Sequence, residues 1–255
     1  LMEANIELLA SLGEQDVKLT VGQFGTTVGA ETYDYTDNAF HSRSFGFAIE
    51  PTHHTGVKAE TSLEAFDLTV GIVNDSTDPD TNADRGNNAV ITGLSYTLGD
   101  SVGWLGGTEL TYGGVHEAGA DDSDVTNYYF GLTKEITTDL TYSLAWDIRE
   151  DGQTKSAAVN GADSNIVGHY LSYPLGGGTL NLRVEHGNIN SVDLDGNGVA
   201  IDGVNDIDGL ESITIGYDYP IWTGVTSRIE YSQTDWDDKD DGSTDALGIN
   251  LVYSF

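Results

Sequence analysis

Acidic residues at regular spacing could form a cation site in this sequence. Residues 193–198 read Asp-Leu-Asp-Gly-Asn-Gly, with oxygen ligands at positions 1, 3 and 5 and glycine at position 6, as in an EF-hand-type loop. Position 12 is Val204, so a different acid must replace the usual closing carboxylate, with Asp202, Asp206 and Asp208 as the choices. Two interpretations stand for this segment: a solvated acidic loop and a Ca²⁺ site. The candidate ligands are Asp193, Asp195, Asn197 and Asp202.

Two other groupings have ligand-type side chains. A second acidic cluster comprises Asp237, Asp238, Asp240, Asp241 and Asp245, with the same two interpretations. His53 and His54 are adjacent, with His41 nearby. Neighbouring residues of a strand point to opposite faces, so the two histidines should not share a metal ion.

The sequence gives little support for catalysis. It has no Cys, which excludes a disulfide framework, a thiolate zinc site and a Cys nucleophile. Nucleophile-elbow, Walker A, His-Glu-x-x-His and dinucleotide motifs are absent. A weak alternative is a hydrolase site on an outer wall, built from His169, His186, Ser172 and Ser191. We expect a protein that is not an enzyme and requires no cofactor.

The charge excludes further classes. The 255 residues hold 42 Asp+Glu against 10 Lys+Arg, a formal charge of −32. Such a chain lacks the basic patches that bind nucleic acid or anionic membrane surfaces. No run of 18 apolar residues and no signal-peptide pattern occurs in the sequence.

Side chains alternate with a period of two along most of the chain, which is typical of strands with one apolar face. Leu247, Ile249, Leu251 and Tyr253 fall on one face, and small or polar residues fall between them. The pattern predicts thirteen strands and no helix of useful length. The strands are expected at 3–12, 16–24, 53–62, 65–74, 89–98, 104–115, 126–136, 139–149, 165–174, 179–189, 210–220, 224–235 and 245–255.

Short and long connections alternate between these strands, and aromatic residues gather near both strand ends. Short turns on one side, long loops on the other and aromatic belts at both rims are features of outer-membrane barrels. A closed barrel also satisfies every strand N–H and C=O within lipid. We therefore predict an all-β fold: one transmembrane antiparallel β-barrel over residues 1–255.

The segment from Val21 to Glu60, VGQFGTTVGAETYDYTDNAFHSRSFGFAIEPTHHTGVKAE, resembles the OmpL-like β-barrel porin family. Val70-Gly71-Ile72-Val73-Asn74 is similar too, although Asp75-Ser76 stands where the family usually has Gly-Trp. The C-terminal Phe255 looks like the assembly signal of outer-membrane barrels. The sharp likeness covers about a fifth of the chain. It implies a pore-forming outer-membrane protein, often trimeric, without catalysis.

An odd strand number is unusual for a bacterial barrel. It predicts at least one further strand before Leu1, and three would give a porin of sixteen strands, with fourteen as the alternative. Residues 25–52 would then join the fifth and sixth strands, where sixteen-stranded porins carry the loop that folds into the pore. A structureless loop of this length is usually functional. We expect it to form the constriction.

Most basic residues alternate in step with the small, polar side chains of their strands. A charged side chain that faces lipid costs about 2–4 kcal/mol, so this polar face should line the channel. An inward basic row opposite an acidic loop would produce a transverse field, whereas pairing among the charges would only stiffen the wall. Arg43 would oppose the loop acids or only pin the loop to the wall. The candidate pore residues are Lys18, Lys58, Arg149, Arg183 and Arg228 on strands and Arg43, Glu31, Asp34, Asp37 and Glu50 in the loop.

These patterns predict a porin in the outer membrane of a Gram-negative bacterium, through which small hydrophilic solutes and ions diffuse passively. The expected partners are the lipid bilayer, lipopolysaccharide and two further copies in a homotrimer, and nucleic acid is not among them. A solute-selective channel is one alternative. The other is a structural or adhesive barrel whose acidic extracellular loops bind Ca²⁺.

Overall fold

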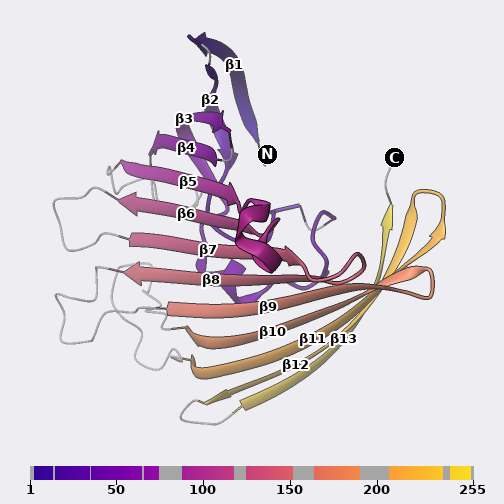
Figure 1. Ribbon diagram of the computed structural model, residues 1–255. Coiled ribbons are helices and arrows are strands. Elements are labelled where there is room, and N and C mark those ends of the chain that lie inside the picture. Colours follow the sequence, from indigo (N-terminus) through magenta and orange to yellow (C-terminus); the bar gives the residue numbers. More distant parts are fainter. Residues whose placement is uncertain are drawn as a thin grey trace, which may run out of the picture.

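The protein is described by a computed structural model that places most of the chain (Figure 1). Its secondary structure is almost entirely β. The described residues are 3–13, 15–34, 36–64, 66–74, 88–117, 125–151, 164–189, 207–237 and 242–253.

In the residues that the structure describes, thirteen strands form one antiparallel sheet, and each strand pairs with its neighbours in sequence. The predicted strand number and the antiparallel all-β fold are confirmed. In the described part of the chain, β1 and β13 are the two edges of the sheet. The strands are β1 (Ala4–Leu12), β2 (Gln15–Gly25), β3 (His53–Leu63), β4 (Phe66–Val73), β5 (Ala89–Thr97), β6 (Glu109–Glu117), β7 (Val125–Glu135), β8 (Thr141–Asp151), β9 (Ser164–Leu175), β10 (Gly178–Ile189), β11 (Ile207–Trp222), β12 (Val225–Asp237) and β13 (Gly242–Tyr253).

The described residues also include two short helices, and one of them overlaps a predicted strand. α1 (Phe45–Ile49) lies between β2 and β3, and its N-cap Ser44 accepts a hydrogen bond from Phe47 N at 3.0 Å. The 3₁₀ helix η1 (Asp100–Leu105) includes Trp104 and Leu105, which were predicted to open the sixth strand. That strand begins at Glu109 because Gly107 turns the chain at a φ of 73°. No helix in the described ranges has the length and apolar character to cross a bilayer.

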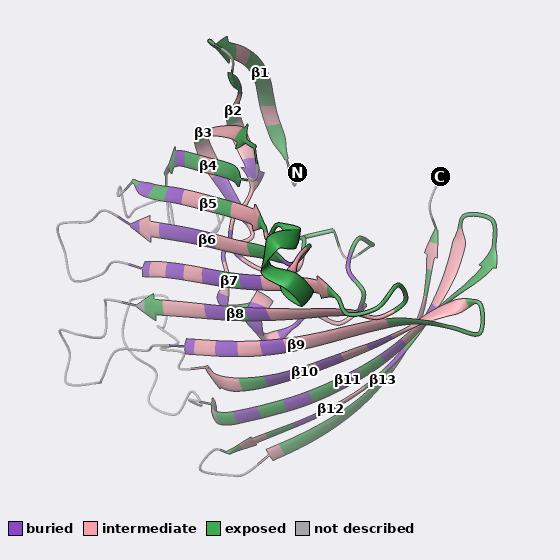
Figure 2. Cartoon of the chain, in the orientation of Figure 1, coloured by how far each residue is buried: buried purple, intermediate pink, exposed green. Residues whose placement is uncertain are grey.

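The two faces of the sheet differ as the alternation predicts (Figure 2). On β11, Ile213 and Ile215 are 39% and 45% exposed, whereas Thr214 between them is 1% exposed. Large apolar side chains thus point outward, and small or polar ones point inward. Outward rings also contact across strands, as in the stacked pair Phe66 and Tyr96, whose centroids are 4.4 Å apart.

Residues 26–52, which we call the interior loop, cover part of the inward face and lie behind β7–β9 in Figure 1. Val28 of this loop joins a buried apolar cluster with Phe24, Ile91 and Val115 from the strands. Ile49 of α1 forms a second cluster with Ile166 and Leu210. The interior loop therefore covers apolar residues of the inward face.

Candidate functional site

The interior loop contacts strands from β6 to β12. An added Cβ at Gly113 on β6 would lie 1.9 Å from the carbonyl oxygen of Thr27, and one at Gly216 on β11 would lie 3.2 Å from the Phe40 ring. Asn181 on β10 donates a hydrogen bond to the carbonyl of Ala39 at 3.4 Å. One loop can reach all these strands only because the sheet curves around it.

Two carboxylates of the inner wall accept hydrogen bonds from the loop backbone. Glu230 on β12 accepts from the N–H of His41 at 2.7 Å and from that of Ser42 at 3.2 Å. Glu185 on β10 accepts from Phe45 N at 2.7 Å, at the start of α1. Hydrogen bonds from backbone N–H groups to ionised acceptors are stronger than neutral ones. These contacts fix the middle of the loop on the wall.

Arg183 on β10 is a third side chain that joins the loop to the wall, beside Glu185. Its side chain is only 3% exposed and lies 3.0 Å from the carboxylate oxygens of both Glu31 and Glu185. Its Nη1 also donates to the carbonyl of Ser42 at 3.0 Å, and its guanidinium lies 4.8 Å from the centroid of Phe40. The structure therefore places Glu31 and Arg183 in direct contact instead of on opposite sides of a gap.

Glu50 and Asp147 form an acidic contact where α1 meets β8. A Cβ on Gly46 of α1 would lie 2.3 Å from Asp147 Oδ2, so the helix backbone passes close to this carboxyl group. Burial, and then the neighbouring Asp147 carboxylate, raise the pKa of Glu50 well above its usual value. A proton held by Glu50 reduces the repulsion between the two carboxyl groups.

Arg43 lies on the same loop as the acids that it was expected to oppose. Its guanidinium donates to the carbonyls of Thr32 and Tyr33, sits 4.2 Å from the Phe47 centroid and lies 3.8 Å from Glu31. These contacts close the loop upon itself. They lie within the interior loop and not on the wall, so neither the opposition of Arg43 to the loop acids nor its pinning of the loop to the wall is established, and both stay predictions.

The other basic candidates lie on strands with the inward phase. Lys18 is 2.8 Å from Glu60, and Lys58 is 3.3 Å from the same carboxylate. Arg228 binds Asp218 through two nitrogens, at 2.9 and 3.0 Å. Arg149 belongs to β8 and is half-buried. Pairing between inward charges is thus a general property of the described wall.

The predicted calcium ligands Asp193, Asp195, Asn197 and Asp202 lie outside the described residues, as do Asp238, Asp240 and Asp241 of the second cluster. Within the ranges that the structure describes, no group of three or more His, Cys, Asp or Glu side chains could hold a metal ion. His54 Nε2 lies 3.0 Å from Thr26 Oγ1, while His53 Nδ1 lies 2.9 Å from Thr52 Oγ1. Both histidines therefore contact the ends of the interior loop.

The histidines of the hydrolase alternative stand on the outer face. The rings of His169 and His186 stack at 5.7 Å, and His169 Nδ1 lies 2.8 Å from the Tyr142 hydroxyl. Ser172 has the opposite phase on the same strand and bonds Asn181 at 2.7 Å. His169 and Ser172 thus point to different sides of the sheet, and Ser191 lies outside the described residues.

The loop anchors were not identified from the sequence. The alternation of the strands places Glu185 and Glu230 on the inward face, but it places Asp67 and Glu109 there as well. Nothing in a strand pattern separates an acid that accepts loop N–H groups from one that faces water. Gly113 had a weak signal, because a glycine inside a strand can mark a close backbone approach.

A curved antiparallel sheet with an apolar outer face, a polar inner wall and an internal loop defines an outer-membrane β-barrel channel. Over residues 1–255 the sequence matches the family described as "Putative beta-barrel porin-2, OmpL-like", and the chain belongs to this family. The protein is therefore a porin of the bacterial outer membrane. None of the curated proteins compared with the chain matches it.

Two solved structures share the fold. The outer membrane channel DcaP of Acinetobacter baumannii has a TM-score of 0.61 and 13% sequence identity, with 98% of this chain and 83% of that one covered. A refined porin structure has a TM-score of 0.55 and 12% identity, with 98% and 80% covered. At these identities the likeness concerns the fold alone.

Proposed function

We propose that this porin carries small hydrophilic solutes and ions by passive diffusion, and that the interior loop narrows its channel. The supporting observation is the attachment of the loop to the inner wall by Arg183, Glu185 and Glu230. A loop fixed at several points reduces the open cross-section and excludes large solutes. The proposal includes ion transport in a Gram-negative outer membrane, a homotrimer, lipopolysaccharide contacts and no catalysis. Ca²⁺ binding at 193–202 stays a separate prediction.

Planar-bilayer recording tests the proposal. The refolded protein should give stable, ohmic conductance steps. A double variant, Arg183→Gln with Glu230→Ala, removes anchors from β10 and β12 and should raise the single-channel conductance because the loop leaves the wall. Lys18→Gln is the control, since Lys18 pairs with Glu7 and Glu60 instead of the loop. Equal conductance in the double variant would overturn the constriction role, and a lack of channels would overturn the function.

A further inference from the structure

The 3₁₀ helix η1 belongs to a segment that projects from the end of the β5–β6 hairpin. Leu98 N donates to the carbonyl of Thr108 at 2.8 Å, and Gly107 N donates to the carbonyl of Leu98 at 2.7 Å. These bonds close the base of the segment, so residues 99–107 lie outside the ladder of the two strands. The segment is at the end of the sheet with the short turns, which outer-membrane barrels direct to the periplasm.

The apolar side chains of η1 are left uncovered by the described part of the chain. Val102 is 45% exposed, Trp104 is 77% exposed and Leu105 is 36% exposed. Every residue of η1 is exposed, and none belongs to either buried apolar cluster. Apolar residues of the interior loop behave differently, since Val28 and Ile49 are only 3% and 5% exposed. An uncovered apolar segment of this kind marks a contact with another partner.

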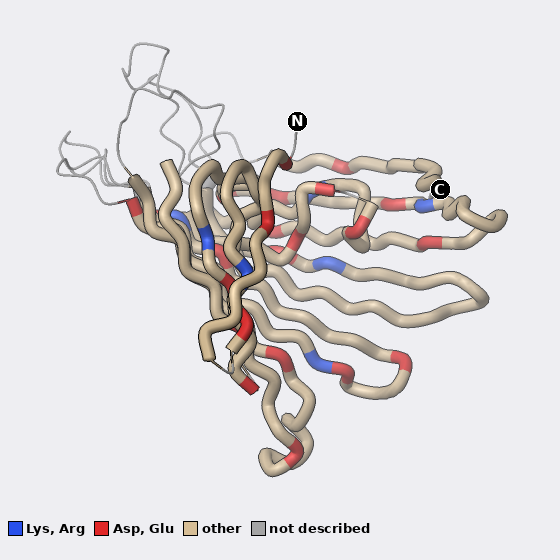
Figure 3. Tube along the Cα trace, turned by 90° about the horizontal axis from the view of Figure 1, so that it is seen from above, with Lys and Arg blue, Asp and Glu red and all other residues tan. Residues whose placement is uncertain are grey.

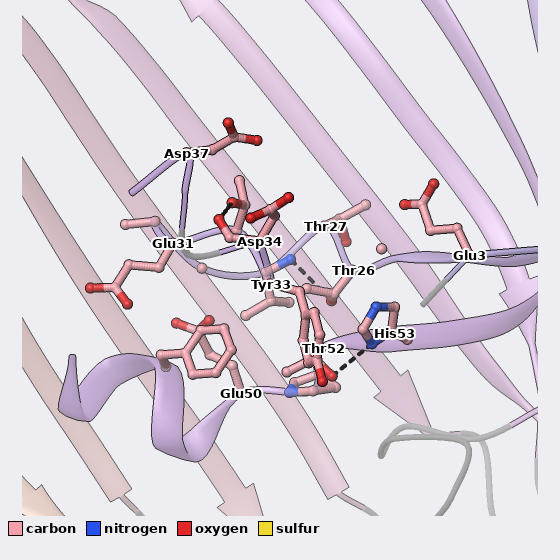
Figure 4. A pocket seen from close by; sticks show the side chains of 17 residues that line it. Glu3, Thr26, Thr27, Glu31, Tyr33, Asp34, Asp37, Glu50, Thr52 and His53 are labelled. Atoms are coloured by element: carbon pink, nitrogen blue, oxygen red, sulfur yellow. Dashed lines mark hydrogen bonds between the residues drawn. The ribbon is translucent and has the colours of Figure 1, made fainter. Parts of the chain in front are cut away.

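The surroundings of η1 differ from those of the channel interior. The cavity of about 590 Å³ beside the interior loop is lined mainly by hydroxyl and carboxylate side chains, as Figure 4 shows. In Figure 1, η1 is the short coil in front of the ends of β5–β7, whereas the interior loop lies behind the sheet. η1 therefore lies on the outer side of the wall, away from the channel.

Lys134 on β7 attaches η1 to this outer side. Its Nζ donates to the carbonyl of Gly106, the residue that follows η1. Lys134 comes four residues after Phe130, whose exposed ring contacts the exposed ring of Trp146, so Lys134 points to the outer face as well. The other Lys and Arg residues that the structure describes point inward or, like Arg43, lie in the interior loop, and Figure 3 shows how few there are. Within the described residues, Lys134 is the one cation of the outer wall.

We infer that η1 docks onto the glycerophospholipids of the periplasmic leaflet, with Trp104 among their headgroups and Lys134 facing their phosphates. The docking surface continues the outer wall beside it, where residues such as Leu110 face hydrocarbon in a barrel of this family. Tryptophan favours the boundary between lipid tails and water. The Lys134 ammonium has three donors, of which the Gly106 carbonyl uses one. This contact goes beyond the proposed diffusion function and does not depend on conductance.

Depth-dependent fluorescence quenching tests the inference, because the four Trp residues of the protein lie in different surroundings. Single-Trp variants keep Trp104, Trp146 or Trp236 and carry Trp→Phe substitutions at the other three positions. Each variant is refolded into vesicles of phosphatidylethanolamine and phosphatidylglycerol with a nitroxide label either on the headgroup or deep in the acyl chain. Trp104 should be quenched more strongly by the headgroup label than by the deep label.

The chain supplies a control on each side of the wall. Trp146 points outward and is 42% exposed, so at least one lipid label should quench it, which shows that the barrel has inserted. Trp236 packs against the inward cluster that contains Ile49, so neither label should quench it strongly. 

Lys134→Gln tests the attachment of η1 in the variant that keeps only Trp104. It should lower the quenching of Trp104 by about twofold, since one lysine beside anionic headgroups strengthens binding a few-fold. Lys18→Gln is the matched control, because Lys18 is a lysine of the inner wall that pairs with Glu60. This control should leave the quenching of Trp104 unchanged.

Each result decides for or against the docking of η1 on lipid. Resistance of Trp104 to both lipid labels, while Trp146 is quenched, overturns it. Aqueous iodide then separates the causes, because it quenches a Trp104 in water and spares one that is covered by protein, such as a second copy of the chain. Stronger quenching of Trp104 by the deep label overturns its place among the headgroups, and equal quenching with and without Lys134→Gln overturns the role of Lys134. A Trp146 that neither label quenches overturns the lipid-facing wall, and the docking of η1 with it.

Discussion

Arg183 and Glu31 are 152 residues apart in the sequence, and their side chains lie 3.0 Å apart in the folded protein. Both are almost fully buried, with 3% and 7% of their side chains exposed. The pair joins a loop from the first part of the chain to a strand from its last third. It makes the position of the interior loop depend on β10.

Arg183→Gln should release the loop. Removing one partner of a buried ion pair costs about 3–5 kcal/mol, because the other charge remains buried and unpaired. Trypsin should then cleave faster after Arg43, which lies inside the loop. Cleavage in the folded protein is followed by mass spectrometry, with Lys18→Gln as the control for loss of a wall cation. An Arg43 bond that is equally resistant in both variants would contradict this prediction.

Glu230 should tolerate one substitution better than another. Glu230→Ala removes the acceptor of the N–H groups of His41 and Ser42, at a cost of about 1.5–3 kcal/mol for each hydrogen bond to a charged group. Glu230→Gln keeps one acceptor oxygen and should lose less. Amide hydrogen exchange at residues 41 and 42 measures the difference. We expect exchange to be fastest in Glu230→Ala, slower in Glu230→Gln and slowest in the unmodified protein. Equal exchange rates in the two variants would be inconsistent with an acceptor role.

Gly113→Ala should displace the first part of the loop. The new Cβ would lie 1.9 Å from the Thr27 carbonyl oxygen, and backbone atoms cannot rotate away as a side chain does. Single-channel conductance should change, and the thermal midpoint should fall. Gly248→Ala is the matched control, since its Cβ meets nothing within 4 Å. If the two substitutions give the same conductance and midpoint, the close contact at Gly113 has no role.

Glu50 should make stability depend on pH. Its pKa is raised in the folded state, so the folded protein binds the proton more tightly than the unfolded chain does. Stability is therefore greatest below the usual carboxyl pKa of about 4.3 and falls as pH rises toward the raised value. Glu50→Gln cannot ionise and should make this fall smaller. Thermal midpoints of both proteins across pH 4–8 check it, and parallel curves would count against it.

The sheet could be predicted from the sequence because lipid and water impose a strict alternation on the strands. Thr214 between Ile213 and Ile215 shows that rule directly. The start of β6 was misplaced because Trp104 and Leu105 fit a strand pattern, while the nearby glycines close a 3₁₀ turn. The loop contacts could not be predicted, since Glu230 meets His41 only through curvature of the whole sheet.

Every strand pairs with its sequence neighbours, so each hairpin can form from local contacts alone. The interior loop follows a different rule, because its partners on β10 and β12 are synthesised well after it. Assembly therefore has an order: the strands must pair as far as β12 before the N–H groups of the loop can bind Glu230. Until then the early strands lack the docked loop, and the contacts of the loop with Glu185 and Glu230 form only after those strands are in place.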